Sequence, residues 1–199
     1  MLIEKKGKIL TLLEFENLVQ FSWNQTLDFE NEKIIQDLTD RGKKLYKKGE
    51  LTLEQLWFGK YVKKEILEKD LPDVTIRWID PLVGWGVFAN RNFKKMEFIA
   101  EYYGKVRKRN RSDTKNAYCF EYIVAPGFKT PYTIDALDQG GLSRYLNHST
   151  SPNLNSALAT IDDISHVIFF TKEPIAKGTQ LCYDYGPDYW SKRVAPIPL

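Results

Sequence analysis

The sequence predicts a mainly β domain preceded by an α-helical region. Up to about residue 72, apolar residues recur at helical spacing; beyond it, short β-branched and aromatic segments follow one another without helices between them. Strands that follow strands argue against a parallel α/β sheet. The 199 residues, 43% of them apolar, suffice for one full domain with an extension. We therefore expect a helical region over residues 1–72, a catalytic β domain over 73–190 and a tail over 191–199.

The helical region has two clear amphipathic stretches. Their apolar residues are Leu10, Leu13, Leu18 and Phe21, and then Leu53, Leu56, Trp57 and Tyr61. Thr52 and Gln55 fit a capping box that opens the second stretch. Lysines between them alternate with acids, which is typical of a solvated helix face rather than a nucleic-acid surface. We expect this region to pack on the β domain or to form a partner or dimer contact.

The predicted strands lie at 74–79, 97–103, 118–124, 132–135 and 166–171, bounded by Gly, Pro, Asn and Asp. Residues 105–115 form the one dense basic run. By itself this run indicates an exposed loop that is basic for solubility.

Charge and cysteine content exclude several classes of protein. A net charge of +3 leaves no histone-type basic tail, so direct nucleic-acid binding is not expected. Cys119 and Cys182 lack metal-site spacing and suggest no disulfide framework, which predicts no bound metal and a reducing compartment. No secretory signal or apolar stretch of membrane-spanning length is present, so we expect a soluble protein without membrane contact.

Gly84, Gly86 and Ala89 formally fit the dinucleotide-binding pattern GxGxxA. That fingerprint needs a helix to begin at the glycines so that its N-terminus can hold pyrophosphate. Here Asn90-Arg91-Asn92 and another predicted strand follow instead. A turn whose missing side chains let the backbone approach a ligand fits better, and an ordinary β-turn is the alternative.

Two further segments carry more information. They read RYLNHSTSPN at 144–153 and LCYDYG at 181–186. With GWG at 84–86 and EYYG at 101–104, they resemble in order and separation the signature segments of SET-domain protein lysine methyltransferases. The resemblance covers roughly the last two thirds of the chain. It implies a SET fold, made of small curved antiparallel sheets with a pseudoknot-like C-terminal active site.

The resemblance also implies a function and a site. The expected activity is transfer of methyl groups from S-adenosylmethionine (SAM) to lysine in a histone or histone-like basic protein, with the basic run beside the substrate groove. Three tyrosines match catalytic positions: Tyr102, Tyr183 and Tyr185. The implied cofactor-binding residues are Gly84, Trp85, Gly86, Tyr118, Arg144, Asn147, His148, Tyr185 and Trp190. Three acids near the predicted groove could receive a basic peptide: Glu101, Asp135 and Asp138. His166, outside any motif, is expected to be structural.

Tyrosines suit this chemistry because a narrow aromatic channel desolvates an ammonium group, lowers its pKa and aligns the amine. The family has Phe or Tyr at the position of Tyr183, and a hydroxyl there holds a water where further methyl groups would rotate. We therefore expect mainly mono-methylation.

The sequence departs from chromatin SET enzymes at Thr150, where their zinc-binding cysteine stands. The aromatic segment 187–190 is expected to close the pocket instead, with Trp190 near adenine or as a roof. A zinc-free chain resembles small bacterial or viral SET proteins, among them the chlamydial histone-methylating effectors. It would act in a bacterial cytoplasm or, after secretion, in a host nucleus. The alternatives are a pseudoenzyme that binds SAM or a peptide, and a nucleic-acid-binding module.

Overall fold

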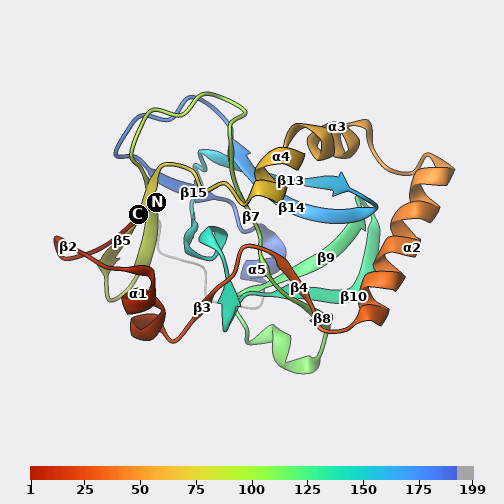
Figure 1. The fold of residues 1–199 in the computed structure, drawn as a ribbon, viewed down its shortest axis with the longest axis horizontal. Helices are drawn as coiled ribbons and strands as arrows, with labels where there is room; N and C mark the ends of the chain where they lie inside the picture. The colour runs from red at the N-terminus through yellow and green to blue at the C-terminus, as the bar shows by residue number, and fades with distance from the viewer. Residues whose placement is uncertain (192–199) are drawn as a thin grey trace.

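The computed structural model describes residues 1–191, and its β-rich part consists of small sheets (Figure 1). One sheet has the order β12 (Asn147–His148), β15 (Gln180–Tyr183), β6 (Gly84–Ala89), β5 (Val74–Asp80), β1 (Leu2–Lys5) and β2 (Lys8–Ile9). A second has the order β4 (Leu27–Phe29), β8 (Gly104–Lys108), β10 (Phe128–Asp135) and β9 (Cys119–Ala125). A third has the order β13 (Leu154–Ile161), β14 (Ile164–Thr171) and β7 (Phe98–Glu101), and β11 (Gln139–Gly140) pairs with β3 (Ser22–Trp23). The mainly β prediction is confirmed.

The predicted N-terminal helical region is present, and the two predicted amphipathic stretches correspond to its first and third helices. The helices of this region are α1 (Leu12–Val19), α2 (Glu32–Lys48), α3 (Leu53–Tyr61) and α4 (Lys63–Glu68). Short helices near the site are η1 (Arg111–Thr114), η2 (Leu142–Tyr145) and α5 (Pro187–Trp190). The domain boundary near residue 72 stays a prediction. Of the predicted tail, residues 192–199 lie outside the described part of the chain.

The capping residues differ from the prediction in one detail. Thr52 accepts a hydrogen bond from the backbone N–H of Gln55, as a cap should. The Gln55 side chain does not return the bond, because it is buried and donates to the carbonyl of Val124 in β9. The reciprocal capping box belongs to α1, between Thr11 and Glu14. Gln55 thus ties the helical region to a strand of the β domain.

The first 30 residues also contain short strands, which the helical spacing of the sequence did not predict. β1 pairs in parallel with β5, and β4 pairs in parallel with β8. β1 and β2 form a hairpin whose turn, Lys6-Gly7, has positive φ at both residues. Segments of two to four residues show too few alternations to be recognised by periodicity. The N-terminal region therefore extends the sheets of the β domain.

Helices α2 and α3 pack closely on the β13–β14 hairpin (Figure 1). A Cβ placed on Gly59 would lie 1.9 Å from the carbonyl oxygen of Thr160, and one on Gly42 would lie 2.0 Å from that of Asp163. Only glycine allows a helix to approach a backbone this closely. A satellite core around Phe58, Ile168 and Phe170 fills the space between α3 and the sheet. These contacts fix the hairpin whose β14 pairs with β7, the strand that leads into Tyr102.

Candidate active site

The four sequence motifs converge on one cavity of about 660 Å³. This volume lies within the usual range of small-molecule sites, about 300–1,000 Å³. The predicted site residues that line it are Gly84, Trp85, Tyr102, Tyr118, Arg144, Asn147, Tyr183 and Tyr185. The other predicted site residues do not line the cavity but contact residues that do; they are Gly86, His148 and Trp190. Gly84 and Tyr185, which are 101 positions apart in the sequence, therefore share a single pocket.

The glycine motif begins β6 rather than forming a free turn. Gly84 has φ +79° and open space where a side chain would be. A Cβ on Gly86 would lie 2.8 Å from Nε2 of Gln180 and 3.1 Å from Nδ2 of Asn147. The next element after β6 is strand β7, so no helix N-terminus is available to hold a pyrophosphate. Gly86 instead lets β6 lie directly against the Asn147 side chain.

Asn147 and His148 link the two C-terminal motifs. They form β12, which pairs in parallel with Cys182 and Tyr183 of β15. The Asn147 side chain donates to the carbonyl of Trp85 over 3.1 Å, and His148 Nδ1 accepts the backbone N–H of Tyr185 over 3.2 Å. The glycine motif and both C-terminal motifs are thus held in one hydrogen-bonded unit.

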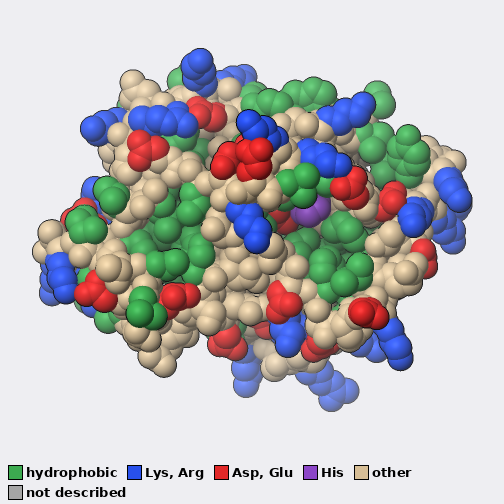
Figure 2. Space-filling view, viewed as in Figure 1, with side chains coloured by type: hydrophobic (Ala, Val, Ile, Leu, Met, Phe, Trp, Pro, Cys, Tyr) green, Lys and Arg blue, Asp and Glu red, His purple; other side chains and the backbone are tan. Residues whose placement is uncertain are grey.

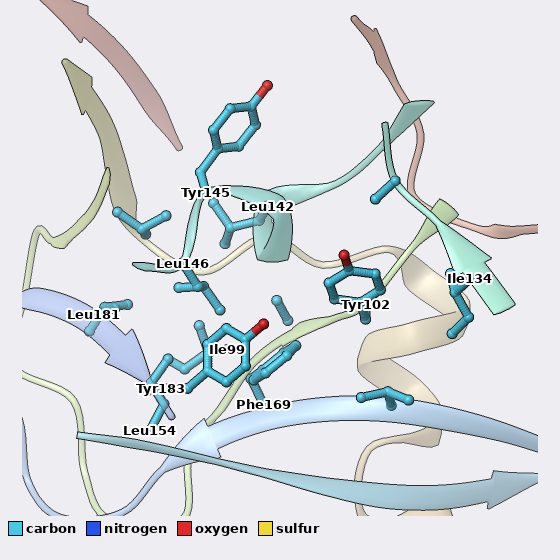
Figure 3. Close-up of a cluster of buried hydrophobic side chains, with 14 of the residues drawn as sticks. Ile99, Tyr102, Ile134, Leu142, Tyr145, Leu146, Leu154, Phe169, Leu181 and Tyr183 are labelled. Atoms are coloured by element: carbon cyan, nitrogen blue, oxygen red, sulfur yellow. The ribbon is translucent and has the colours of Figure 1, made fainter. Parts of the chain in front are cut away.

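Two of the three tyrosines predicted to be catalytic, Tyr183 and Tyr185, pack against each other, and Tyr102 is connected to them through Phe169. Figure 3 shows Tyr102 and Tyr183 above Phe169, whose ring centroid lies 4.6 Å from that of Tyr183. Tyr185 follows at 4.7 Å from Tyr183. The Tyr102 hydroxyl donates to the Tyr118 carbonyl and the Tyr185 hydroxyl donates to the Leu146 carbonyl, both over 2.8 Å. Among the described residues, no group hydrogen-bonds the Tyr183 hydroxyl, although its side chain lines the cavity.

Burial determines the charge state of these phenols. Burial, and secondarily the neighbouring tyrosines, raise the pKa of Tyr102, Tyr183 and Tyr185 well above the ordinary value for a phenol. All three hydroxyls are therefore neutral at physiological pH. They can donate and accept hydrogen bonds, but they provide no phenolate base.

Arg144 and Tyr118 form another part of the wall. The Arg144 guanidinium lies 3.9 Å from the Tyr118 ring centroid and donates from Nε to the carbonyl of Ala136 over 2.8 Å. A second nitrogen donates to the Leu137 carbonyl over 3.2 Å. These contacts hold the guanidinium flat against the ring.

Helix α5 brings a residue to the site that the motifs did not identify. Tyr189 lines the cavity, and its ring lies 4.7 Å from Tyr185. Trp190 stacks parallel to Tyr185 at 6.0 Å and meets His148 edge-on at 4.8 Å. Trp190 thus supports Tyr185 from behind, and its predicted contact with a cofactor stays a prediction. The aromatic pair in segment 187–190 was the available signal, and it did not distinguish which ring faces the pocket.

Two of the three acids proposed to receive a basic peptide contact other side chains of the protein instead. Glu101 is 1% exposed and lies 2.7 Å from Nδ1 of His166, which accounts for the structural role expected of His166. Asp135 lies 2.7 Å from Arg107, within the basic run. Of the three, Asp138 is exposed. The expectation is therefore wrong for Glu101 and Asp135, because both carboxylates already contact side chains of the protein itself.

The basic run is not one exposed loop. Its first part is β8, and Arg107 within it also pairs with Asp113 over 2.6 Å. Arg109 pairs with Glu121 over 2.6 Å, and both residues line the outer part of the cavity. The outer cavity is therefore polar, whereas its inner end is aromatic.

Within residues 1–191, no cluster of three or more His, Cys, Asp or Glu side chains is placed to hold a metal ion. Burial raises the pKa of Cys119 and of Cys182 to about 11, so both thiols are protonated at neutral pH. The described helices also include none that is long and apolar enough to span a membrane.

Comparison with known proteins agrees with this geometry. The SET domain family model matches residues 84–186, which is half of the chain and contains the four motifs. The chain belongs to the SET domain family. The histone-lysine N-methyltransferase Su(var)3-9 of Drosophila melanogaster is 34% identical over 114 residues, which cover 51% of this chain and 18% of that protein. The N-lysine methyltransferase KMT5A of Xenopus tropicalis is 37% identical over 112 residues, which cover 52% of this chain and 33% of that protein.

A solved structure is also similar to this SET domain. The crystal structure of KRYPTONITE in complex with mCHG DNA and SAH superposes with a TM-score of 0.50 at 27% identity, covering 60% of this chain and 25% of that chain. The chain thus spans a third or less of the length of each of these three proteins. The similarity concerns the SET domain and not their other parts.

Proposed function

We propose that this SET domain is a SAM-dependent protein-lysine N-methyltransferase. The observation that supports this most is the convergence of the glycine motif, Asn147 and three buried tyrosines on one cavity. One end of that cavity is suited to a nucleoside and amino-acid ligand, and the other to a long aliphatic amine. The related histone-lysine and N-lysine methyltransferases support the same assignment.

The residues present fit the cofactor. The open backbone at Gly84 and the side chains of Trp85, Tyr118, Arg144 and Asn147 would hold SAM, with His148 and Gly86 fixing these groups from behind. The SAH in the KRYPTONITE complex supports this choice of ligand. When bound, SAM supplies an electrophilic methyl group on a sulfonium. No metal is needed for such a transfer.

The tyrosines prepare the lysine. A free lysine with a pKa of about 10.4 is only about 0.1% neutral at pH 7.4, and only the neutral amine is a nucleophile. The rings of Tyr102, Tyr183 and Tyr185 exclude bulk water from the inner cavity and thereby lower the pKa of an amine placed there. Since these phenols stay protonated, the proton leaves to water. The role of the aromatic channel is to desolvate and align the amine.

The substrate class follows from the relatives and from chemistry. We propose that the substrate is a histone or histone-like basic protein, because the related Su(var)3-9 is named as a histone-lysine N-methyltransferase. Incubation of the protein with labelled SAM, core histones and a panel of other basic proteins, followed by mass spectrometry, tests this. We expect label on lysine of a histone-like protein. If SAM binds but no histone-like protein is labelled, the substrate class is wrong; if SAM does not bind, the proposed function is wrong.

Tyr183 sets the number of methyl groups in this proposal. Its hydroxyl is without a protein partner among the described residues and so can hold a water molecule beside the amine. We expect the wild type to give mainly mono-methyllysine and Tyr183→Phe to give di- and trimethyllysine. Mass spectrometry of the products measures this, with Tyr46→Phe on the exposed face of α2 as the control. Mainly trimethylated product from the wild type would contradict the assignment.

The proposal also includes the subgroup of SET proteins to which this chain belongs. Thr150 and the aromatic α5 support a SET protein without zinc modules, of the bacterial or viral kind that includes the chlamydial effectors. Action in a host nucleus and dimer formation through the N-terminal helices remain predictions.

A further inference from the structure

A second, smaller hollow of about 190 Å³ lies between α2 and the β9–β10 hairpin. We call it the basic groove, because Arg41, Lys44, Lys48 and Lys129 line it and Glu50 is the acid among its lining residues. The other residues of its wall are Leu45, Val124, Phe128 and Thr130. In Figure 2, Lys and Arg side chains gather along the right-hand edge of the molecule, over α2, with acidic side chains between them.

The cations of the groove are arranged by two separate elements. Arg41, Lys44 and Lys48 are three and four positions apart, so they share one face of α2 over about 10 Å of helix. A cation in the last turn of a helix interacts favourably with the helix dipole, which accounts for Lys48, whereas Arg41 and Lys44 lie further from the end of α2. The dipole does not account for Lys129, which the hairpin brings to the same hollow.

These cations are only partly neutralised within the protein. Arg41 lies 3.0 Å from Asp37, Lys129 lies 3.3 Å from Glu121, and Lys48 lies 3.9 Å from Glu50. Lys44 has no carboxylate within ion-pair distance among residues 1–191. Exposed pairs of this kind contribute only about 0–1 kcal/mol each, so a phosphate can compete for their cations.

The groove adjoins the active site, because Lys129 lines both hollows. From this arrangement we infer that the basic groove binds the phosphate backbone of duplex DNA, which the small net charge of the whole chain did not lead us to expect. The choice of DNA rests on the proposed function: a free basic protein is repelled by this surface, whereas a histone-like protein bound to DNA presents a polyanion beside its own lysines. Backbone phosphates need only cations in a groove and no base-specific contacts.

The test measures the binding of a fluorescently labelled DNA duplex of about 20 base pairs to the full chain by anisotropy. Contacts to three or four phosphates predict a slope of about −3 for log K against log salt, so binding weakens about 60-fold between about 50 and about 200 mM salt. We expect Lys44→Glu/Lys48→Glu to weaken binding at least tenfold and to reduce the slope by about two. The matched control is Lys60→Glu/Lys172→Glu, an equal charge change at exposed positions outside the groove.

Equal losses in the two double variants would overturn the inference, because they would indicate diffuse attraction to net charge. Tighter binding of polyglutamate than of duplex DNA would overturn it in favour of an acidic protein. Thermal unfolding of each variant verifies the fold. Methyl transfer separates this inference from the proposed function. We expect the wild type to be more active on a DNA-bound basic protein than on the free protein. The groove variant should keep at least the activity on the free protein, assayed without DNA, and lose the increase on the DNA-bound one.

Discussion

Replacing Tyr185 by phenylalanine is expected to lower the rate of methyl transfer by about 100-fold while the fold stays intact. The hydroxyl of Tyr185 holds the Leu146 carbonyl over 2.8 Å, directly before Asn147 and His148. Its ring stands between Tyr183, Tyr189 and Trp190 at the inner end of the cavity. Loss of the hydroxyl releases the segment that positions the cofactor site relative to the amine, and small displacements of reacting atoms cost about two orders of magnitude.

The matched control is Tyr61→Phe. The Tyr61 hydroxyl also donates to a backbone carbonyl over 2.8 Å, that of Met96, but Tyr61 lies on α3 outside the cavity. Single-turnover transfer from labelled SAM gives the rate, and calorimetric titration gives the affinity for SAM. We expect the Tyr61 variant to keep its rate. Unchanged transfer in the Tyr185 variant would remove this residue from the catalytic group.

The convergence of the four motifs was expected from their resemblance to the SET family, and the structure adds the local physical requirement that each motif meets. Gly84 has a positive φ, and Gly86 lies where β6 approaches Asn147 too closely for a side chain. Tyrosine at positions 102, 183 and 185 provides rings of fixed shape next to these segments. Such requirements leave particular residue types at fixed spacing along the chain, and the resemblance to the SET family is based on that pattern.

Other features depend on contacts that no local pattern records. The acid Glu101 lies beside the channel tyrosine Tyr102 in sequence, yet strand alternation directs it into the core against His166. Tyr189 and Trp190 are adjacent aromatic residues, and only the direction of α5 places the first in the cavity and the second behind Tyr185. The first strands, β1 to β4, are too short to show a period. In each case a residue distant in the sequence determines where the side chain or strand lies.

Phe15 connects the N-terminal region to the proposed cofactor site, and Phe15→Ala should lower the free energy of unfolding by about 3–5 kcal/mol. The Phe15 ring is fully buried, meeting Trp85 edge-on at 4.9 Å and Tyr145 at 5.3 Å. Trp85 is the central residue of the glycine motif, and its carbonyl accepts the Asn147 side chain. A cavity at Phe15 therefore loosens the wall to which Asn147 is anchored, and we expect about tenfold weaker binding of SAM.

The comparison that separates this coupling from simple loss of stability is Phe58→Ala. Phe58 is 2% exposed and packs 4.8 Å from Phe170 in the satellite core, away from the lining of the cavity. Denaturant unfolding should show similar losses for both variants, whereas titration with SAM should show weaker binding only for Phe15→Ala. If the alanine variant does not fold, Phe15→Leu, which leaves a smaller cavity, replaces it. Equal SAM affinities in both variants would mean that α1 supports the fold alone, because a helix that belongs to the cofactor site must transmit its disturbance to the ligand.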